Sequence, residues 1–73
     1  MPAYTRKQQI IDDLERKIKS GELLPGAKLP SAAQLCKQYE VSRMTVRLAI
    51  DYLKAVRLVV GVPGSGIYVR GDL

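Results

Sequence analysis

The segment Val41-Ser42-Arg43-Met44-Thr45-Val46-Arg47-Leu48-Ala49-Ile50-Asp51-Tyr52-Leu53 decides the fold, because it has the pattern of a helix with two different faces. Its apolar residues recur at the i, i+3, i+4, i+7 spacing of one buried stripe: Val46, Ala49, Ile50 and Leu53. Arg43 and Arg47 lie on the other side, and Ser42 is a favourable N-cap. A helix that begins in this way can enter a DNA major groove, where arginine binds guanine O6 and N7.

The size and composition of the chain favour one small folded domain. Its 73 residues are 47% hydrophobic, so we expect a single domain with one core over residues 1–73. The one cysteine excludes an internal disulfide, and no apolar run approaches the ~20 residues of a membrane span. No apolar segment follows the first seven residues as it would in a signal peptide. The sequence therefore predicts a soluble, cytoplasmic protein with no membrane partner.

The charge of the chain indicates an anionic partner, since its net charge is +5. Residues 28–73 hold seven lysines and arginines against three acidic residues, whereas residues 1–27 have a net charge of only +1. The excess therefore accompanies the helix at 41–53. With no histidine and no cluster of metal ligands in the sequence, we predict neither an enzyme nor a metal or cofactor. Cys36 is interpreted as a small core hydrophobe.

Two further helices are predicted before this segment. The first runs from about Lys7 to Ser20 and ends at Gly21, a residue that adopts the left-handed cap without strain. After a type II turn at Leu24-Pro25-Gly26-Ala27, the second begins at the N-cap Ser31 and ends near residues 39–40. About two residues then lead to Ser42, which is the spacing of a helix-turn-helix. The buried positions predicted in these two helices are Ile10, Ile11, Leu14, Ile18, Leu35 and Tyr39.

A β-hairpin is predicted after the third helix, which we place at about residues 42–56. The hairpin covers about residues 58–69 and turns at Pro63-Gly64-Ser65-Gly66. A two-stranded ribbon is marginal alone, so Lys28-Leu29 is expected to pair with it as a third strand. The fold class is α+β, mainly α: a winged helix-turn-helix of three helices with a small antiparallel β-hairpin wing. In this fold the third helix enters the major groove and the hairpin lies beside it.

The chain resembles the DNA-binding domain of the GntR family of bacterial transcriptional regulators from about Tyr4 to Val69. Its most specific matches are the segment from Gly21 to Ser31, Gly-Glu-Leu-Leu-Pro-Gly-Ala-Lys-Leu-Pro-Ser, and the segment from Val41 to Ala49. Gly64-Ser65-Gly66-Ile67-Tyr68-Val69 matches the wing. The resemblance implies a homodimeric repressor or activator on a short inverted repeat of double-stranded DNA, and we favour a repressor. It also implies that the start of the third helix contacts DNA through Ser42, Arg43 and Thr45, with Arg47 a turn later.

Several positions depart from the family pattern because they lack its usual basic or charged residues. These positions hold Ala32, Ala33, Leu48, Gly61, Val62 and Ser65. We therefore expect weaker and less salt-dependent DNA binding than in a typical relative. Arg57 stands where a helix-ending glycine is common. Regulators of this family usually continue into an effector-binding and dimerisation domain, whereas this sequence stops at Leu73, as a fragment or a stand-alone domain would.

The expected DNA interface joins the starts of the second and third helices to the wing. Arg43 and Arg47 would contact base edges or phosphates, and the serines and Thr45 would fix the register on the backbone. The glycines of the wing tip would let the main chain approach the sugar-phosphate closely. The expected contact residues are Ser31, Ser42, Arg43, Met44, Thr45, Arg47, Gly64, Ser65 and Gly66, with Lys28 and Lys37 as secondary phosphate candidates.

Two expectations concern partners. With no spare apolar helix or heptad seam, the isolated domain should be monomeric in solution and should pair as a homodimer on an inverted repeat, its half-sites about one helical turn apart or closer. The alternative function is a protein-interaction module, because Met44 and Leu48 place apolar side chains on the face that should meet DNA.

Overall fold

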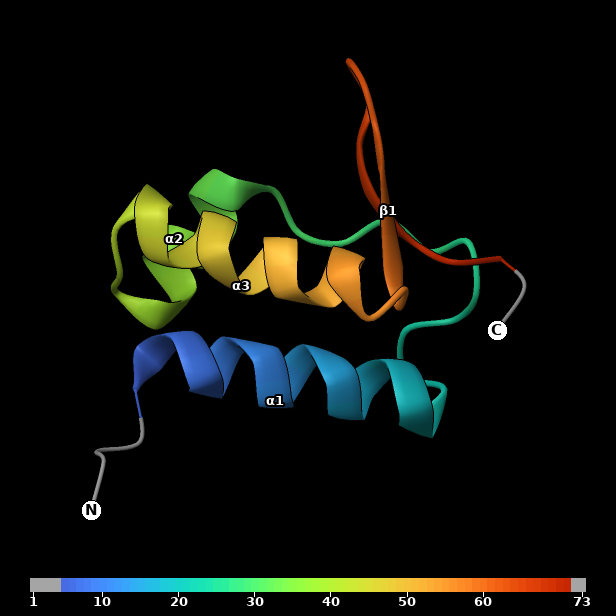
Figure 1. Ribbon diagram of the computed structural model, residues 1–73, viewed down its shortest axis with the longest axis horizontal. Helices are drawn as coiled ribbons and strands as arrows, with labels where there is room; N and C mark the ends of the chain where they lie inside the picture. The colour runs from blue at the N-terminus through green and yellow to red at the C-terminus, as the bar shows by residue number, and fades with distance from the viewer. Residues whose placement is uncertain (1–4, 72–73) are drawn as a thin grey trace.

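Three helices and a two-stranded hairpin make up residues 5–71, which are the residues described by the computed structural model (Figure 1). The helices are α1 (Arg6–Ser20), α2 (Ala32–Tyr39) and α3 (Arg43–Ala55), and the strands are β1 (Val59–Val62) and β2 (Gly66–Val69). This order confirms the α+β, mainly α, winged helix-turn-helix. Tyr4 and Leu73, the ends named above for the resemblance and for the chain, lie outside the described residues.

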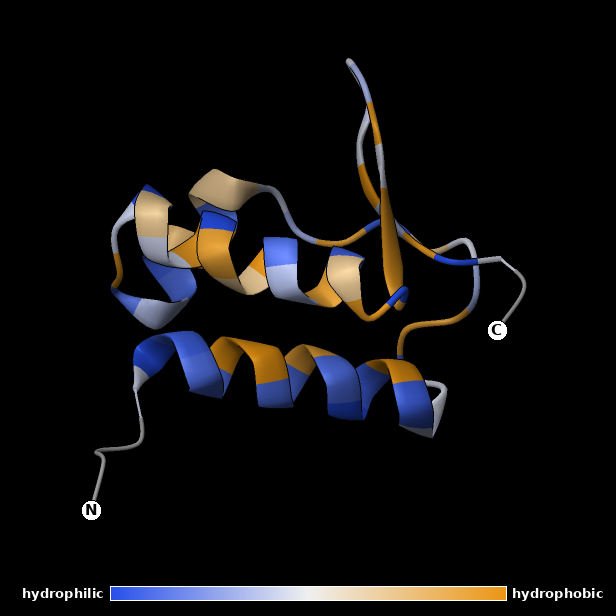
Figure 2. Ribbon diagram, in the orientation of Figure 1, coloured by the Kyte–Doolittle hydropathy of each residue, from blue (hydrophilic) through white to orange (hydrophobic). Residues whose placement is uncertain are grey.

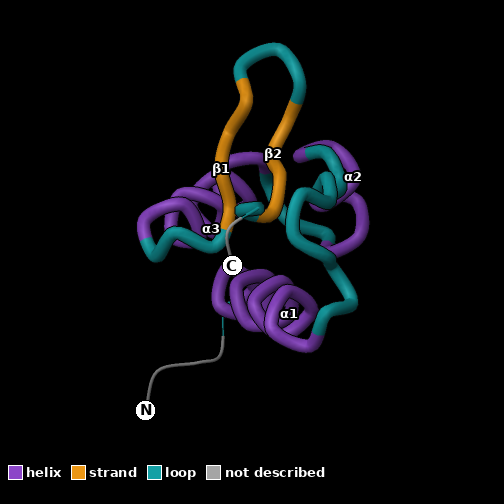
Figure 3. Tube along the Cα trace, turned by 90° about the vertical axis from the view of Figure 1, so that its right-hand side faces the viewer, coloured by secondary structure: helices purple, strands orange, loops and turns teal. Residues whose placement is uncertain are grey.

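The hairpin projects from the body that the three helices form (Figure 1). α1 and α3 lie along each other, α2 packs on α3, and the hairpin rises beside the C-terminal end of α3 (Figures 1 and 3). We call the hairpin and its turn, residues 59–69, the wing. The start of α2, one side of α3 and the wing therefore border a common surface, and α1 lies on the opposite side of the molecule.

Each helix buries the stripe that its periodicity predicts. In α1 the apolar side is turned toward α3 and the charged side outward (Figure 2). Thr5 caps the start of α1 by accepting from the Gln8 amide, and Gly21 ends it with φ 85°. The helix begins at Arg6, one residue before the expected start. All ten apolar positions predicted for the three helices are buried.

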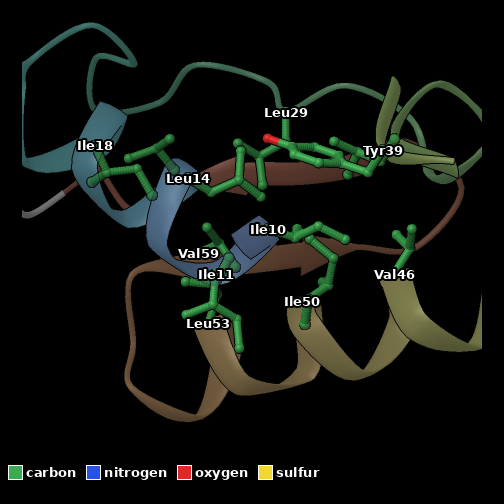
Figure 4. Close-up of a cluster of buried hydrophobic side chains, with 13 residues drawn as sticks. Ile10, Ile11, Leu14, Ile18, Leu29, Tyr39, Val46, Ile50, Leu53 and Val59 are labelled. Atoms are coloured by element: carbon green, nitrogen blue, oxygen red, sulfur yellow. The ribbon is translucent and has the colours of Figure 1, made fainter. Parts of the chain in front are cut away.

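One hydrophobic core joins the helices to the base of the wing (Figure 4). Leu29, from the segment between α1 and α2, and the wing residues Val59 and Val69 are buried with the helical stripes. Cys36 is half-buried and packs against the same cluster, as expected of a small hydrophobe. Burying each large aliphatic side chain contributes about 1.5–3 kcal/mol, so this core fixes the orientation of α3 and the side chains it exposes.

The turn between α2 and α3 is as short as the sequence predicts. Glu40 ends α2 in the left-handed conformation with φ 55°, and its amide donates to the Cys36 carbonyl. Ser42 then caps α3. Left-handed backbone costs a non-glycine residue about 1–2 kcal/mol, so the packing of the two helices maintains this tight connection.

The end of α3 also places a non-glycine residue in a left-handed conformation. Arg57 has φ 64°, its amide donates to the Lys54 carbonyl at 3.0 Å, and the Leu58 amide donates to the Leu53 carbonyl at 3.0 Å. This pair of bonds forms a Schellman motif, in which glycine is preferred at the residue that Arg57 occupies.

The wing is antiparallel, with Val59 opposite Val69 and Val62 opposite Gly66. Its turn has Pro63 at the second position and Gly64 at the third with φ 76°, and the Ser65 amide donates to the Val62 carbonyl at 3.0 Å. The expected third strand is reduced to a single bridge between Lys28 and Tyr68. This bridge is flanked by two backbone hydrogen bonds, from the Leu29 amide to the Ile67 carbonyl and from the Val69 amide to the Ala27 carbonyl, both at 2.8 Å.

Candidate nucleic-acid interface

The start of α3 is exposed and held by the Ser42 side chain. The Ser42 hydroxyl accepts from the Thr45 amide at 3.2 Å and lies 3.2 Å from the Thr45 hydroxyl. Ser42 therefore serves as the N-cap, and its hydroxyl also forms a hydrogen bond with the Thr45 hydroxyl. The cap leaves the first amides of α3 directed outward at the positive end of the helix dipole, which is a favourable place for a phosphate.

Arg43 and Arg47 project from the same stripe of α3, because they are four residues apart. Both are exposed, and neither forms an ion pair with a described residue. Two ion pairs lie on α1, between Arg16 and Asp13 at 3.0 Å and between Lys19 and Glu15 at 3.3 Å. The two arginines of α3 are thus available to an external anion.

A groove of about 390 Å³ runs along the side of α3 that carries the arginines. Pro30 and Ala32 border it at the start of α2, and Ile67 borders it on the wing. Its α3 side holds Arg43, Arg47, Asp51 and Lys54. We call it the α3–wing groove. It brings the α3 arginines, the start of α2 and the wing to one surface, as the winged-helix interpretation requires.

Met44 and Leu48 lie on a neighbouring stripe of α3 and are exposed to 61% and 48%. Both side chains lie outside the buried stripe of α3, which confirms the exposure expected from the sequence. Tyr52 and Val56 continue the same four-residue spacing with exposures of 46% and 43%. The exposed surface of α3 is therefore partly apolar beside its basic stripe.

Ser31 forms a capping box at the start of α2. Its hydroxyl accepts from the Gln34 amide at 3.1 Å, and its own amide donates to the Gln34 side chain at 2.8 Å. Ser31 is exposed next to the α3–wing groove, followed by the small residues Ala32 and Ala33. The cap is satisfied without an external ligand, and the exposed N-terminal amides of α2 remain as an anion-attracting group.

The wing tip differs from the expected open glycine pair. Gly64 and Ser65 are exposed, and the Ser65 hydroxyl is hydrogen-bonded to the Tyr68 hydroxyl. Gly66 is only half-exposed because Lys28 lies over it: a Cβ built on Gly66 would be 2.8 Å from Lys28 Cε. Gly66 also begins β2 rather than belonging to the tip.

The two lysines expected as secondary phosphate contacts lie in different places in the structure. Lys28 is exposed beside the wing, whereas Lys37 is exposed in the last turn of α2 and does not line the α3–wing groove. Sequence reasoning missed Lys54, which does line it. The helical spacing of the sequence could have indicated Lys54, since residues 43, 47 and 54 fall within about 40° of one another on a helix of 3.6 residues per turn.

Neither a metal site nor a membrane helix is present among residues 5–71. The described residues contain no group of three or more histidine, cysteine or acidic residues that could hold a metal ion. Within the same range, no helix is long and apolar enough to cross a membrane.

The fold and the exposed basic surface define a winged helix-turn-helix domain of the DNA-binding class that serves transcription regulation. The model of the bacterial regulatory proteins, gntR family, matches residues 6–69. The chain belongs to this family, and the resemblance seen in its sequence is confirmed.

Known proteins similar to the chain include two repressors and a DNA complex. The mannosyl-D-glycerate transport/metabolism system repressor MngR of Escherichia coli (strain K12) is 40% identical over 65 residues, 89% of this chain and 27% of that protein. The HTH-type transcriptional repressor NagR of Bacillus subtilis (strain 168) is 41% identical over 61 residues, 84% of this chain and 25% of that protein. The crystal structure of AraR(DBD) in complex with operator ORR3 has a TM-score of 0.84 at 31% identity, covering 94% of this chain and 89% of that one. The chain thus spans about a quarter of the curated relatives' length.

Proposed function

We propose that this domain binds double-stranded DNA sequence-specifically, with α3 in the major groove and the wing beside it. The observation that carries the proposal is the position of Arg43 and Arg47. Both project from one exposed stripe at the capped start of α3, next to a groove that the wing also borders. Arginine in a major groove can donate two hydrogen bonds to guanine O6 and N7, which gives about 1–3 kcal/mol of discrimination per base pair.

The residues around these arginines would fix the domain on the phosphate backbone. Ser31, Ser42 and Thr45 lie at the starts of α2 and α3, where outward amides and the helix dipoles attract phosphate. Met44 would meet base edges or sugar through its apolar side chain. Gly64 and Ser65 form the exposed tip that approaches the backbone, and Lys28 and Lys37 are secondary phosphate contacts.

We further propose that the function is repression by two copies on an inverted repeat. MngR and NagR are repressors, which supports this choice over activation, and AraR(DBD) has been solved in complex with an operator. Each copy would remain monomeric off DNA. A regulator of this kind acts in the cytoplasm and needs neither catalysis nor a cofactor.

Selection of bound duplexes from a random pool, followed by titration at several salt concentrations, tests DNA binding. We expect a selected motif with two related half-sites. We also expect a salt slope shallower than that of a relative with the full set of basic residues, because each phosphate contact contributes about 0.9 to the slope. A folded chain that binds no duplex at low salt would contradict the proposal.

A second candidate function is protein interaction through the exposed apolar residues of α3. Met44 and Leu48, continued by Tyr52 and Val56, favour it because four exposed apolar side chains follow one another along the helix. Substituting Leu48 and Tyr52 by glutamine separates the two functions, because both are exposed and neither is among the expected DNA contacts. DNA binding through the arginines would keep most of its affinity, whereas a protein interface centred on these residues would be lost.

A further inference from the structure

The wing of this domain has no charge of its own. From Leu58 to Val69 the sequence contains no lysine, arginine or acidic residue. A hairpin that lies against a DNA backbone gains most of its affinity from cations that neutralise phosphates. Any such cations must therefore come from other parts of the chain.

Lys54, from the last turn of α3, lies against one face of the wing. A Cβ built on Gly61 would be 3.1 Å from Lys54 Nζ and 3.2 Å from Lys54 Cε. Gly61 is paired with Ile67 and lies on the same face of the strand as the buried Val59, two residues earlier, so this is the face that turns toward α3. Lys54 is exposed, and its ammonium group sits at the junction of the wing and the α3–wing groove.

Lys28 lies against the opposite face of the wing. A Cβ on Gly66 would be 2.8 Å from Lys28 Cε and 3.6 Å from Lys28 Nζ. Gly66 shares its face with Tyr68, to which Lys28 forms its bridge, and this face alternates with that of Ile67. Glycine at both wing positions leaves the space that the two lysine side chains occupy.

We propose that Lys54 and Lys28 are the phosphate contacts of the wing, one on each face, and replace the basic side chains that the wing lacks. The inference rests on the proposed DNA binding and adds Lys54 to that site. Lys54 also continues the stripe of Arg43 and Arg47 along α3. The cationic surface then extends from the start of α3 to the wing, where phosphates on either side of the hairpin would meet a lysine.

The test measures the salt dependence of affinity for a duplex selected by the unmodified chain. Lys54→Gln and Lys28→Gln should each lower affinity about fivefold to tenfold at 0.1 M salt and reduce the slope of log K against log salt by about 0.9. The double variant should lose about twice that slope. Lys19→Gln is the matched control, because it removes the same charge from the outer side of α1 and should leave the slope unchanged.

A rescue variant distinguishes the loss of a cation at the wing from a disturbed fold. Ser65→Arg, added to the double lysine variant, returns a cation to the wing tip and should restore about one unit of slope. The inference is overturned if the lysine variants keep the slope of the unmodified chain, or if Lys19→Gln lowers it equally. If the unmodified chain binds no duplex, the proposed function itself fails. Binding that requires Arg43 but is insensitive to both lysines overturns only the assignment of the wing contacts.

Discussion

Ser42 shows how one hydroxyl can stabilise a helix and still lie at a binding surface. It accepts from the Thr45 amide, and this bond by itself explains a serine at position 42. The proposed phosphate contact is an additional role at the same exposed atom. Stability and affinity must therefore be measured separately at this residue.

Substituting Ser42 by alanine and by aspartate separates the two roles. Ser42→Ala should lower the free energy of unfolding by about 1 kcal/mol, because a cap is lost. Ser42→Asp keeps the acceptor and should change stability by less than about 0.5 kcal/mol. It should nevertheless weaken DNA binding by more than about tenfold, since like charges brought together at an interface repel strongly.

The control is Thr5→Asp, which makes the same change of charge at the N-cap of α1. It should leave affinity for the selected duplex unchanged. Urea unfolding and fluorescence anisotropy provide the two measurements. Equal affinity losses for the two aspartate variants would mean that Ser42 makes no local contact.

Arg57 is the residue whose conformation is least suited to its side chain. Arg57→Gly should stabilise the domain by about 0.5–1 kcal/mol, because relief of left-handed strain exceeds the entropy that glycine adds to the unfolded chain. Gly21→Ala, at φ 85°, should have the opposite effect and cost about 1 kcal/mol. Thermal and urea unfolding of both variants measure this; an Arg57→Gly variant less stable than the parent would refute the strain argument.

At the scale of elements, α3 carries apolar side chains both on its buried stripe and on an exposed stripe. Leu53 is fully buried, whereas Leu48 is about half-exposed. Leu53→Ala should lower the free energy of unfolding by about 2–5 kcal/mol, as deletions in a packed core do. Leu48→Ala, in the same helix, should change it by less than about 0.5 kcal/mol. Comparable losses at both positions, measured by urea unfolding, would contradict the orientation of α3.

Local sequence rules were sufficient to predict the helices, their caps and the hairpin. The spacing of apolar residues identifies each buried stripe, and Ser31, Ser42 and Gly21 occupy the capping positions that their chemistry favours. The left-handed backbone at Glu40 and Arg57 was not predicted, because neither residue favours it and tertiary packing imposes it. The approach of Lys28 and Lys54 to the wing was missed for a related reason, since it depends on where segments distant in sequence meet.

At the scale of the whole molecule, the three helices carry one exposed surface that joins α3 to the wing. The domain measures 36 × 26 × 20 Å, so a single copy covers only a short stretch of duplex. A stable protein dimer usually buries about 1,200–2,000 Å². The exposed apolar side chains of α3 are too few and too close to the basic stripe to supply that area without covering the proposed site.

We therefore expect the 73-residue chain to sediment as a monomer at concentrations up to about 100 μM, where a weak interface stays dissociated. On a selected inverted repeat it should bind with a stoichiometry of two chains per duplex, and on an isolated half-site with one. Analytical ultracentrifugation of the chain alone and of each complex measures both. A dimer without DNA would contradict this expectation.

The most direct test of the central claim is to repeat the duplex selection with Arg43→Ala and Arg47→Ala. The account predicts that each variant loses about 1–3 kcal/mol of affinity for the parental duplex and relaxes the preference at one position of each half-site. Circular dichroism should show that both variants are folded, because both side chains are exposed. Two folded variants that select the parental motif with unchanged affinity would contradict the assignment of α3 as the helix that contacts the bases.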